Sequence, residues 1–425
     1  MNIQTQHVTV LIIGGGPSGL TAAAALAPYV DGTVLVLDRE RETGGIPRHS
    51  DHPGYGIRDR RSFVSGPRYA RRLSADARAA GAVLKTETMV TASVGARSFE
   101  TTSPRGRRII TADAVILATG ARERARPARR IPGDRPDGVL TTGQLQNLVH
   151  VHGEHVGERA VVIGAEPVSW SAVMTLREAG CSVAAMISRY PRSESYTAFR
   201  VGGRLAFQAP VIPHSKVVRI DGNRRVESVE IEDLRTHVRR TIPCDTIVTT
   251  GDWIPDNELV RMAGLTLDPA TLGPVVSADL ATSQPGVFSV GNLVHPVDTA
   301  DAAALDGQHV APAVLAWLDR VRRGPDQLNE PDPFSRGRLQ IVAAPPFRWV
   351  TPQLVAPEDT TPRGHLLTWT DEYRRSPAVI AVQDGHEVGR VRTWWPAAPG
   401  RIYRIPSKVI AGASPSGGPV SLHLA

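Results

Sequence analysis

The N-terminal part of the chain alternates between apolar runs and a glycine-rich segment. An apolar run at 8–13 is followed by the segment 14–19, an alanine-rich run that ends at Leu26, and a second apolar run at 34–37. Short apolar runs bounded by turn residues predict buried strands, and the alanine-rich run predicts a helix. The order therefore predicts strand, turn, helix and strand.

A second unit of the same type lies about 150 residues further along the chain. It comprises an apolar run at 160–163, a turn segment at 164–169, a helical run to Ala179 and an apolar run at 183–187. Such a repeat indicates two copies of one nucleotide-binding unit. The pattern thus predicts an α/β fold with two Rossmann-like dinucleotide-binding domains.

Strand-like segments also occur between and after these units. Residues 83–110 alternate with glycine and proline punctuation and predict a small β-meander, and 114–120 predict a buried strand that ends in a tight turn. Residues 286–292 predict another strand, and 299–319 a helix that begins after Asp298, a good N-cap residue. Because the chain returns after the second unit, the first domain is expected to be discontinuous.

Beyond about residue 335 the pattern predicts a small C-terminal β-rich domain. Its strand-like runs are 339–342, 366–369, 379–382, 387–393 and 420–424. Asp384-Gly385, between two of these runs, predicts a hairpin turn. Four of the seven tryptophans lie here, at 349, 369, 394 and 395. Tryptophan is common at interface hot spots and also in small cores, so the domain is either a docking surface or a structural cap.

Composition narrows the class of protein. With 41% apolar and 21% charged residues, the chain is typical of a soluble globular protein. The net charge of +7 comes without basic runs interleaved with aromatic residues, so we expect no nucleic-acid partner. Five arginines lie between Arg122 and Arg130, where they form either a solvated loop or a contact for an anion or a partner.

The two cysteines, Cys181 and Cys244, argue against a disulfide framework, a zinc site and an iron–sulfur cluster held by this chain. The polar N-terminus and the absence of an apolar stretch of ~20 residues predict no signal peptide, no transmembrane segment and a cytoplasmic location. The histidines at 150, 152 and 155 have loose metal-like spacing, but we expect solvated loop residues and no metal site.

The first glycine-rich segment has the spacing of a dinucleotide-binding turn. Gly14 permits the tight turn, Gly16 lets the backbone approach a pyrophosphate, and Gly19 allows the helix to pack closely on the strand. The N-terminus of the following helix offers free N–H groups to the phosphates. Asp38, at the end of the second strand, can bind the hydroxyls of an adenosine ribose. Together these residues predict a bound dinucleotide.

Three further segments, Gly44-Gly45, Ala118-Thr119-Gly120 and 282–292, resemble the FAD-binding half of the pyridine nucleotide-disulfide reductase superfamily. The resemblance spans about residues 8–320 and implies FAD rather than NAD at the first turn. It also implies a backbone contact from Val90 to adenine, and a helix N-terminus at Thr299 directed at the flavin pyrimidine ring. Asn292 replaces the usual aspartate of the superfamily.

The FAD contacts expected from these motifs are Gly14, Gly16, Pro17, Ser18, Gly19, Asp38, Arg39, Gly45, Ile46, Val90, Ala118, Thr119, Gly120, Gly291, Asn292, Thr299 and Ala300. The expected domains are a discontinuous FAD-binding domain at 1–122 and 256–325, with the β-meander at about 82–112. An NAD(P)-binding-like domain follows at 123–255, and the β-rich domain occupies 335–425.

The second turn departs from the nucleotide-binding pattern. It reads Gly164-Ala-Glu166-Pro-Val-Ser169, so two of three glycines are missing. A carboxylate at Glu166, about 4 Å from a phosphate, would cost on the order of 4 kcal/mol at an effective dielectric of 20. Arg189 could suit a 2′-phosphate, but the lost glycines argue against binding. We therefore expect no functional NAD(P) site, and either a scaffold or a site for another nucleotide.

The segment 46–57 after the Gly-Gly turn contains no cysteine, which excludes thiol–disulfide exchange. Together with 131–144 and 162–169, the segment 44–49 resembles a narrower group of flavoprotein subunits. This group includes opine oxidase A subunits, the hydrogen cyanide synthase B subunit, proline or hydroxyproline dehydrogenase α subunits, and oxidoreductases that accompany glycerol-3-phosphate dehydrogenases. The resemblance implies a second, flavin-containing subunit that oxidises the substrate.

Arg48, His49 and His52 follow the Gly-Gly turn and are the candidate catalytic residues, because histidine moves protons near neutral pH. A structural role for them is the alternative. The functional hypothesis is an FAD-carrying electron-relay subunit of a dehydrogenase or oxidase for an amino acid, imino acid, opine or polyol phosphate. A self-contained NAD(P)H-dependent flavin reductase and a non-redox subunit braced by FAD are the alternatives.

Overall fold

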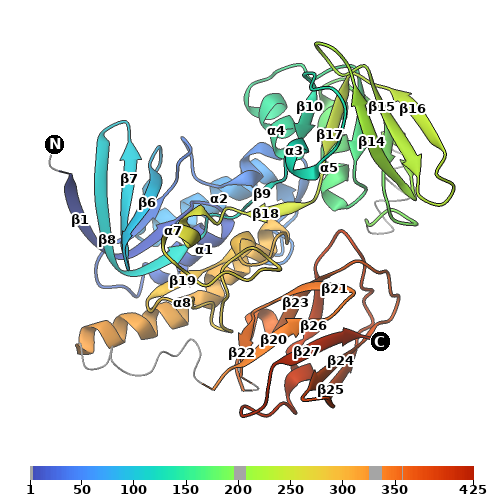
Figure 1. Cartoon of the computed structure of the whole chain (residues 1–425). Helices are drawn as coiled ribbons and strands as arrows, with labels where there is room; N and C mark the ends of the chain where they lie inside the picture. The colour runs from blue at the N-terminus through green and yellow to red at the C-terminus, as the bar shows by residue number, and fades with distance from the viewer. Residues whose placement is uncertain (1–2, 196–206, 325–336, 357) are drawn as a thin grey trace.

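The computed structural model describes residues 3–195, 207–324, 337–356 and 358–425, which fold into two parallel-sheet regions and a β-rich C-terminal unit (Figure 1). We use "C-terminal unit" for residues 337–356 and 358–425. The predicted α/β class with two Rossmann-like regions is confirmed.

The first sheet has the order β5-β2-β1-β8-β7-β6, with β19 also paired to β8. Strands β5, β2, β1 and β8 run parallel, and β8, β7 and β6 form an antiparallel meander. β19 adds in parallel from far along the chain. The bounds are β1 (Gln4–Ile13), β2 (Val34–Leu37), β5 (Val83–Lys85), β6 (Met89–Gly95), β7 (Ser98–Ser103), β8 (Gly106–Leu117) and β19 (Val287–Ser289).

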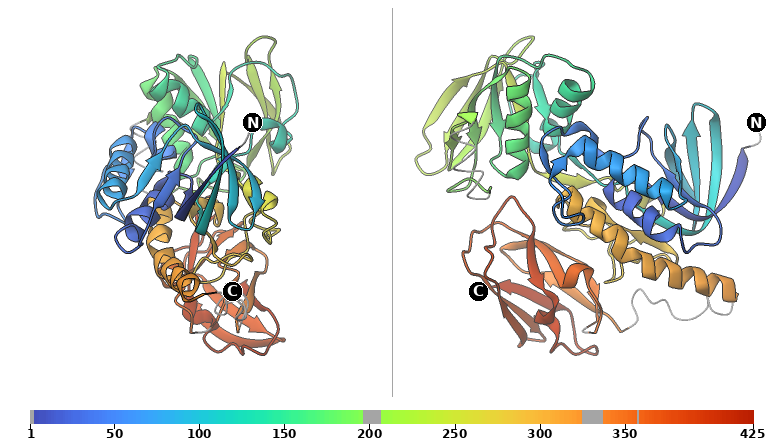
Figure 2. Two further views of the ribbon diagram at one scale, coloured as in Figure 1. Left: turned by 90° about the vertical axis from the view of Figure 1, so that its left-hand side faces the viewer. Right: turned by 180° about the vertical axis from the view of Figure 1, so that it is seen from behind.

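Both faces of this sheet are buried, which explains the unbroken apolar run of β1. Val10 and Ile12 pack on one face against helices α1 (Pro17–Leu26), α2 (Gly66–Ala79) and α8 (Ala300–Arg323). Leu11 and Ile13 pack on the other face, with α7 (Glu258–Met262). Helices α1, α2 and α8 lie side by side (Figure 2, right).

The second sheet is parallel, in the order β10-β17-β11-β12-β13. Helices α4 (Thr142–Gln146) and α5 (Pro167–Glu178) pack against it, and an antiparallel sheet, β14-β15-β16, covers the other face. The strands are β10 (Val139–Thr141), β11 (Arg159–Ile163), β12 (Ser182–Ile187), β13 (Val211–Ile212), β14 (Ser215–Asp221), β15 (Ser228–Asp233), β16 (Arg239–Pro243) and β17 (Thr246–Thr249).

Two short strands carry the chain between the parallel sheets. β9 (Ala121–Glu123) leaves the first sheet and pairs antiparallel with β18 (Trp253–Pro255), by which the chain returns. The remaining short elements are β3 (Pro53–Tyr55), β4 (Val64–Ser65), α3 (Arg126–Arg129), η1 (Ile46–His49), η2 (Asn147–Val151), η4 (Gly291–Leu293), η5 (Pro362–Gly364) and η6 (Ser407–Ile410).

The C-terminal unit is built from two sheets, with the orders β22-β20-β27-β24-β25 and β21-β23-β26. Apolar side chains from both sheets share one core, among them Ile341, Leu366 and Tyr403. The strands are β20 (Leu339–Ala343), β21 (Phe347–Thr351), β22 (Leu354–Val355), β23 (His365–Thr370), β24 (Ala378–Gln383), β25 (His386–Arg392), β26 (Tyr403–Pro406) and β27 (Val420–Leu424). The predicted hairpin at Asp384-Gly385 is confirmed, since β24 and β25 pair across it.

The tryptophans of this unit divide between its core and its surface. Trp349 is buried, and Trp369 packs beside it. Trp395 packs on the main core and donates to the carbonyl of Arg404. Trp394 is 85% exposed. Three of the four tryptophans named from the sequence therefore contribute to the unit's own packing.

Candidate functional site

The first glycine turn is shaped by close backbone contacts at two of its three glycines. Gly14 has a φ of +110°, and a Cβ there would lie 2.3 Å from the Ala118 carbonyl oxygen. A Cβ on Gly19 would lie 2.0 Å from the carbonyl oxygen of Gly14. At Gly16, by contrast, no described atom lies within 4 Å of the Cβ position. The fold therefore requires glycine at positions 14 and 19, whereas position 16 faces open space where a ligand can approach.

Asp38 lies at the end of β2, beneath this turn. Its side chain is buried, and its two oxygens accept from the backbone N–H groups of Gly15 (3.0 Å) and Glu40 (2.8 Å). Burial raises the pKa of Asp38, and these two hydrogen bonds oppose that rise. Each carboxylate oxygen has two lone pairs, so one acceptor site on each remains for a ribose hydroxyl. Arg39 is exposed beside it.

The Gly44-Gly45 turn lies directly against the first glycine turn. The Gly44 N–H donates to the Gly15 carbonyl at 2.6 Å, and a Cβ on Gly45, whose φ is +63°, would lie 3.0 Å from the Cα of Gly16. Thus the two turns close on each other without room for side chains. The next residue, Ile46, exposes its side chain.

Val90 and Ala118 border the same region. The Thr88 N–H donates to the Asp38 carbonyl at 2.9 Å, so the chain enters β6 beside the acid, and Val90 is buried there. Ala118, after β8, supplies the carbonyl that Gly14 approaches. Thr119, its neighbour, donates through its hydroxyl to the Asp256 carbonyl at 2.8 Å.

Gly291 and Asn292 follow β19. A Cβ on Gly291 would lie 2.6 Å from the Ser18 hydroxyl, which places this turn against the start of α1. The Asn292 amide is used within its own loop, because its Nδ2 donates to the Asp298 carbonyl (3.2 Å) and its Oδ1 accepts from the Asp298 N–H (3.0 Å). The ribityl or phosphate contact expected for Asn292 stays a prediction.

Helix α8 begins at Ala300, and the residue before it is Thr299. The expectation that Asp298 caps this helix is wrong, because its carboxylate is bound by Arg404 of the C-terminal unit at 2.7 and 3.0 Å. Asp301, in the first turn, accepts from the Arg58 backbone N–H at 2.9 Å and pairs with its guanidinium at 3.2 Å. A carboxylate at a helix N-terminus is stabilised by the helix dipole.

A buried charge cluster joins the C-terminal unit to α8. Asp306 is 1% exposed and accepts from the Gly291 N–H (3.1 Å), from His295 Nε2 (2.5 Å) and from Arg363 Nη1 (2.5 Å). Burial alone would raise the pKa of Asp306, but Arg363 and His295 outweigh it and hold that pKa well below its usual range. This cluster was not predicted from the sequence. It fixes the Gly291 turn that borders the first glycine turn.

The candidate catalytic histidines lie where the Gly-Gly turn meets the second sheet region. His52 Nε2 is hydrogen bonded to the hydroxyls of Ser50 (2.8 Å) and Ser171 (2.6 Å), and Nδ1 to the Pro53 carbonyl (2.8 Å). Burial lowers the pKa of His52. Since the carbonyl can only accept, Nδ1 carries the proton and Nε2 accepts from a serine hydroxyl. His52 therefore links the turn to α5.

His49 and Arg48 contact each other, with 3.2 Å between Arg48 Nη2 and His49 Nε2. Burial and the Arg48 charge lower the pKa of His49. Arg48 also pairs with Glu40 at 3.8 Å. The structure thus brings Arg48 and His49 together and places His52 in a separate bridge. Catalytic roles for all three stay predictions.

The second turn is closed by its own side chains. A Cβ on Gly164 would lie 2.0 Å from the Thr250 hydroxyl, which is itself bonded to the Ser169 hydroxyl at 2.7 Å. Glu166 is buried and accepts from the Ala165 N–H at 3.0 Å, so its carboxylate takes the position that a phosphate would take. Arg189 turns onto Tyr190, 3.3 Å from its hydroxyl.

The arginines of the basic stretch are engaged in holding the connection between the sheets. Arg122 pairs with Asp256 and Glu258, and Arg129 donates to the carbonyls of Thr250 (3.0 Å) and Gly251 (2.5 Å). Arg126 donates to the carbonyls of Ile131 and Pro132.

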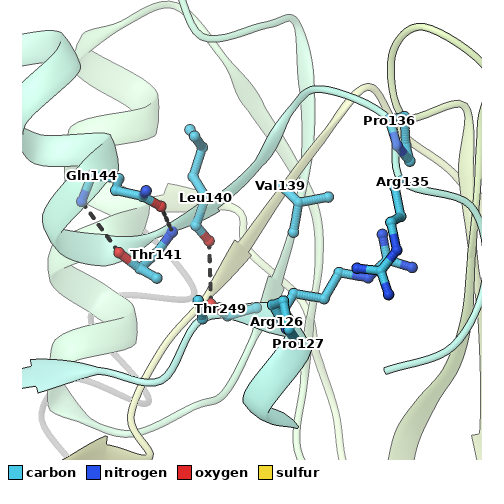
Figure 3. Close-up of a pocket in the computed structure, with 10 residues that line it drawn as sticks. Arg126, Pro127, Arg135, Pro136, Val139, Leu140, Thr141, Gln144 and Thr249 are labelled. Carbon is cyan, nitrogen blue, oxygen red and sulfur yellow. Dashed lines mark hydrogen bonds between the residues drawn. The ribbon is translucent and has the colours of Figure 1, made fainter. Parts of the chain in front are cut away.

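A hollow of about 560 Å³ lies at the carboxyl ends of β10 and β17 (Figure 3). Arg126 and Arg135 line one side, and Thr141 and Gln144, which form the capping box of α4, line the other. This hollow is separate from the residues expected to contact FAD.

In the part of the chain that the structure describes, no group of three or more histidine, cysteine or acidic residues is placed to hold a metal ion. His150, the first of the loosely spaced histidines, contacts Thr175 and Glu178 instead. No described helix is both long and apolar enough to cross a membrane.

Curated relatives include components of multi-subunit flavoenzymes and also reductases. The A-type polypeptide of opine oxidase from Rhizobium meliloti is 28% identical over 350 residues, which cover 73% of this chain and 63% of that relative. The alpha chain of sarcosine oxidase from Corynebacterium sp. (strain P-1) is 26% identical, covering 90% of this chain and 39% of the relative. Thioredoxin reductase of Treponema pallidum (strain Nichols) is 25% identical, covering 74% and 98%. The chain spans about two thirds or less of the length of the opine oxidase relatives that it matches.

Solved structures share the fold. T. acidophilum thioredoxin reductase superposes with a TM-score of 0.62 at 21% identity, covering 73% of this chain and 98% of its own. L-proline dehydrogenase from P. horikoshii superposes with a TM-score of 0.54 at 19% identity, covering 76% and 60%.

The family profile described as pyridine nucleotide-disulphide oxidoreductase matches residues 8–307, well over half of the chain. The match includes both glycine turns, the Gly-Gly turn and the Asp306 cluster residues of α8. The chain belongs to the pyridine nucleotide-disulphide oxidoreductase family and is an FAD-dependent oxidoreductase.

Proposed function

We propose that this chain is the FAD-carrying, electron-relay subunit of a multi-subunit dehydrogenase or oxidase. Its substrate class is an amino acid, imino acid, opine or polyol phosphate, oxidised on a partner or at the interface with it. A second flavin-containing subunit exchanges electrons with the FAD of this chain, and NAD(P) does not take part.

FAD binds at the first glycine turn in this proposal. The proposed contacts are Gly14, Gly16, Pro17, Ser18, Gly19, Asp38, Arg39, Gly45, Ile46, Val90, Ala118, Thr119, Gly120, Gly291, Asn292, Thr299 and Ala300. The open face at Gly16 and the free acceptor sites of Asp38 fit a pyrophosphate and an adenosine ribose. The β9–β18 pair supports the proposed boundaries of the FAD domain, 1–122 and 256–325, and of the second domain, 123–255.

The contrast between the two glycine turns is the observation that carries the proposal. Gly16 faces open space, whereas Glu166, at the matching position, buries a carboxylate in its turn. A negative charge placed there repels a phosphate. One dinucleotide site is therefore open and the other is occupied by the chain itself.

Electrons that reach the FAD need an exit or an entrance. The chain has two cysteines, Cys181 and Cys244, and both are buried and free. Burial raises the pKa of each thiol to about 12, so neither provides a thiolate near neutral pH. With no cysteine pair for disulfide exchange and a closed second site, a partner is the remaining route. Relatives named as subunits of opine and sarcosine oxidases support that route.

A self-contained NAD(P)H-dependent flavin reductase is the second candidate. Relatives named thioredoxin reductase and ferredoxin--NADP reductase favour it, and the T. pallidum protein is matched over 98% of its length. The buried Glu166 carboxylate argues against it.

Purification of the full chain from its native source tests the partner, and a dye-linked assay tests the substrate class. We expect a second flavin-containing polypeptide to co-purify, and we expect the complex, not the isolated chain, to reduce the dye with one of the four substrate classes. A chain that purifies alone and oxidises one of these substrates at a normal turnover rate contradicts the proposal.

A further inference from the structure

The C-terminal unit contacts the second sheet region at the segment that follows β12. The Tyr190 hydroxyl donates to Asp371 Oδ1 at 3.1 Å, and the Arg192 guanidinium lies 3.8 Å from the centre of the Tyr373 ring (Figure 2). In a dinucleotide-binding fold, the end of this strand is where the adenosine ribose is bound. The C-terminal unit thus lies over the edge at which a second nucleotide would enter.

Gly400 of the C-terminal unit is pressed against the second glycine turn itself. A Cβ at this position would lie 2.6 Å from the Cβ of Glu194 and 2.8 Å from the Cβ of Glu166. Carbon atoms do not approach so closely, so the backbone at Gly400 fills the space next to both acids. Glu166 stands where the pyrophosphate would approach the turn.

The turn also uses its own hydrogen-bonding groups. The Ala165 N–H donates to Glu166 Oε2 at 3.0 Å, and the Ala165 carbonyl accepts from the hydroxyls of Ser193 (2.8 Å) and Ser195 (2.9 Å). A phosphate would need the N–H groups of this turn free. Both the turn and the segment above it are therefore committed to contacts within the chain.

We propose that residues 371–373 and 400 form a lid, here called the Gly400 lid, that closes the second nucleotide site, and that glycine at 400 is the residue that permits closure. This inference rests on the proposed exclusion of NAD(P), and it adds the element responsible. Removing the acid from the turn does not open the site by itself, because the lid still covers it.

The lid weakens nucleotide binding in proportion to the time it is closed. When the binding-competent state is only a fraction of the population, the apparent dissociation constant rises by the inverse of that fraction. A lid open about one part in a hundred weakens binding about a hundredfold. Displacing the lid and restoring the turn should therefore reinforce each other.

Binding of ADP-ribose to the full-length, FAD-saturated chain tests the lid by calorimetry, independently of flavin chemistry. The turn variant carries Glu166→Gly and Ser169→Gly, and the combined variant adds Gly400→Leu. Gly385→Leu replaces Gly400→Leu in the control, because Gly385 has a φ of +80°, close to the +78° of Gly400, but no described atom within 4 Å of its Cβ position.

We expect the combined variant to bind ADP-ribose at least about tenfold more tightly than the turn variant, with no gain from Gly385→Leu. Should Gly400→Leu not fold, Asp371→Asn with Tyr373→Ala loosens the same lid without crowding. Equal affinity of the combined and turn variants overturns the lid. Tight ADP-ribose binding by the unmodified chain also overturns it, whereas failure of the relay function alone would appear as substrate oxidation without a partner.

Discussion

Replacing Arg363 by methionine should strongly destabilise the protein, because it leaves the Asp306 carboxylate buried without its cation. Asp306 is 1% exposed, and Arg363 Nη1 lies 2.5 Å from it. Methionine keeps much of the length and apolar volume of arginine but carries no charge. Breaking a buried ion pair by removing one partner costs roughly 3–5 kcal/mol. His295 can supply part of the missing charge, so we expect about 3 kcal/mol.

The assay is denaturant unfolding of the FAD-loaded chain, followed by flavin fluorescence. A loss of about 3 kcal/mol changes the folding equilibrium by on the order of a hundredfold. Because Asp306 also accepts from the Gly291 N–H, we expect earlier release of FAD.

The pH dependence of this loss follows from the lowered pKa of Asp306. A carboxyl whose pKa is depressed in the folded state adds stability that is present above its unfolded pKa, here the ordinary 3.8, and is lost as the pH falls through the folded value. The deficit of Arg363→Met should therefore shrink below about pH 4.

Arg390→Met is the matched control. Arg390 pairs with Glu387 at 2.7 Å in the same C-terminal unit, but its side chain is 53% exposed. Exposed pairs contribute about 0–1 kcal/mol. Equal losses for Arg363→Met and Arg390→Met would refute the role given to the buried cluster.

Two further predictions concern the glycine turns. Gly16→Val should fold but purify without FAD, since its Cβ position is open, whereas Gly19→Val should lower the yield of folded protein, since its Cβ position overlaps the Gly14 carbonyl; circular dichroism and flavin absorbance separate the two, and a yellow Gly16→Val protein would count against the site. Burial and the neighbouring Glu166 raise the pKa of Glu194 to about 8, so its contribution to stability is present below 4.5 and lost as the pH rises through 8. Glu194→Gln should therefore gain unfolding free energy relative to wild type at about pH 9 but not at about pH 5, and an equal effect at both would contradict this.

Local patterns sufficed for the parallel sheets and for the shape of the first turn. Val10 to Ile13 form one apolar run because both faces of the sheet are buried, and the glycine spacing reflects close backbone contacts around the turn. In the C-terminal unit the runs at 339–342 and 420–424 match observed strands, while β21 and β26 were missed.

The unpredicted parts of the site come from residues that are distant in sequence. His295, Asp306 and Arg363 meet only after the C-terminal unit packs on α8, and a lone buried histidine or aspartate gives no local signal. Gly400 has the sequence context of an ordinary turn glycine, and only its contacts with Glu166 and Glu194 distinguish it. His52, expected near the flavin, is bonded to Ser171 because the two regions close on each other there.

Anaerobic stopped-flow mixing of the purified, FAD-loaded chain with NADH and NADPH tests the central claim most directly. The closed second turn predicts that flavin absorbance persists far longer than the turnover time of an ordinary enzyme, roughly 1–1000 ms. The same FAD should bleach when the partner and its substrate are supplied. Full reduction by sub-millimolar NADH or NADPH within about a second, with no partner present, would contradict the account.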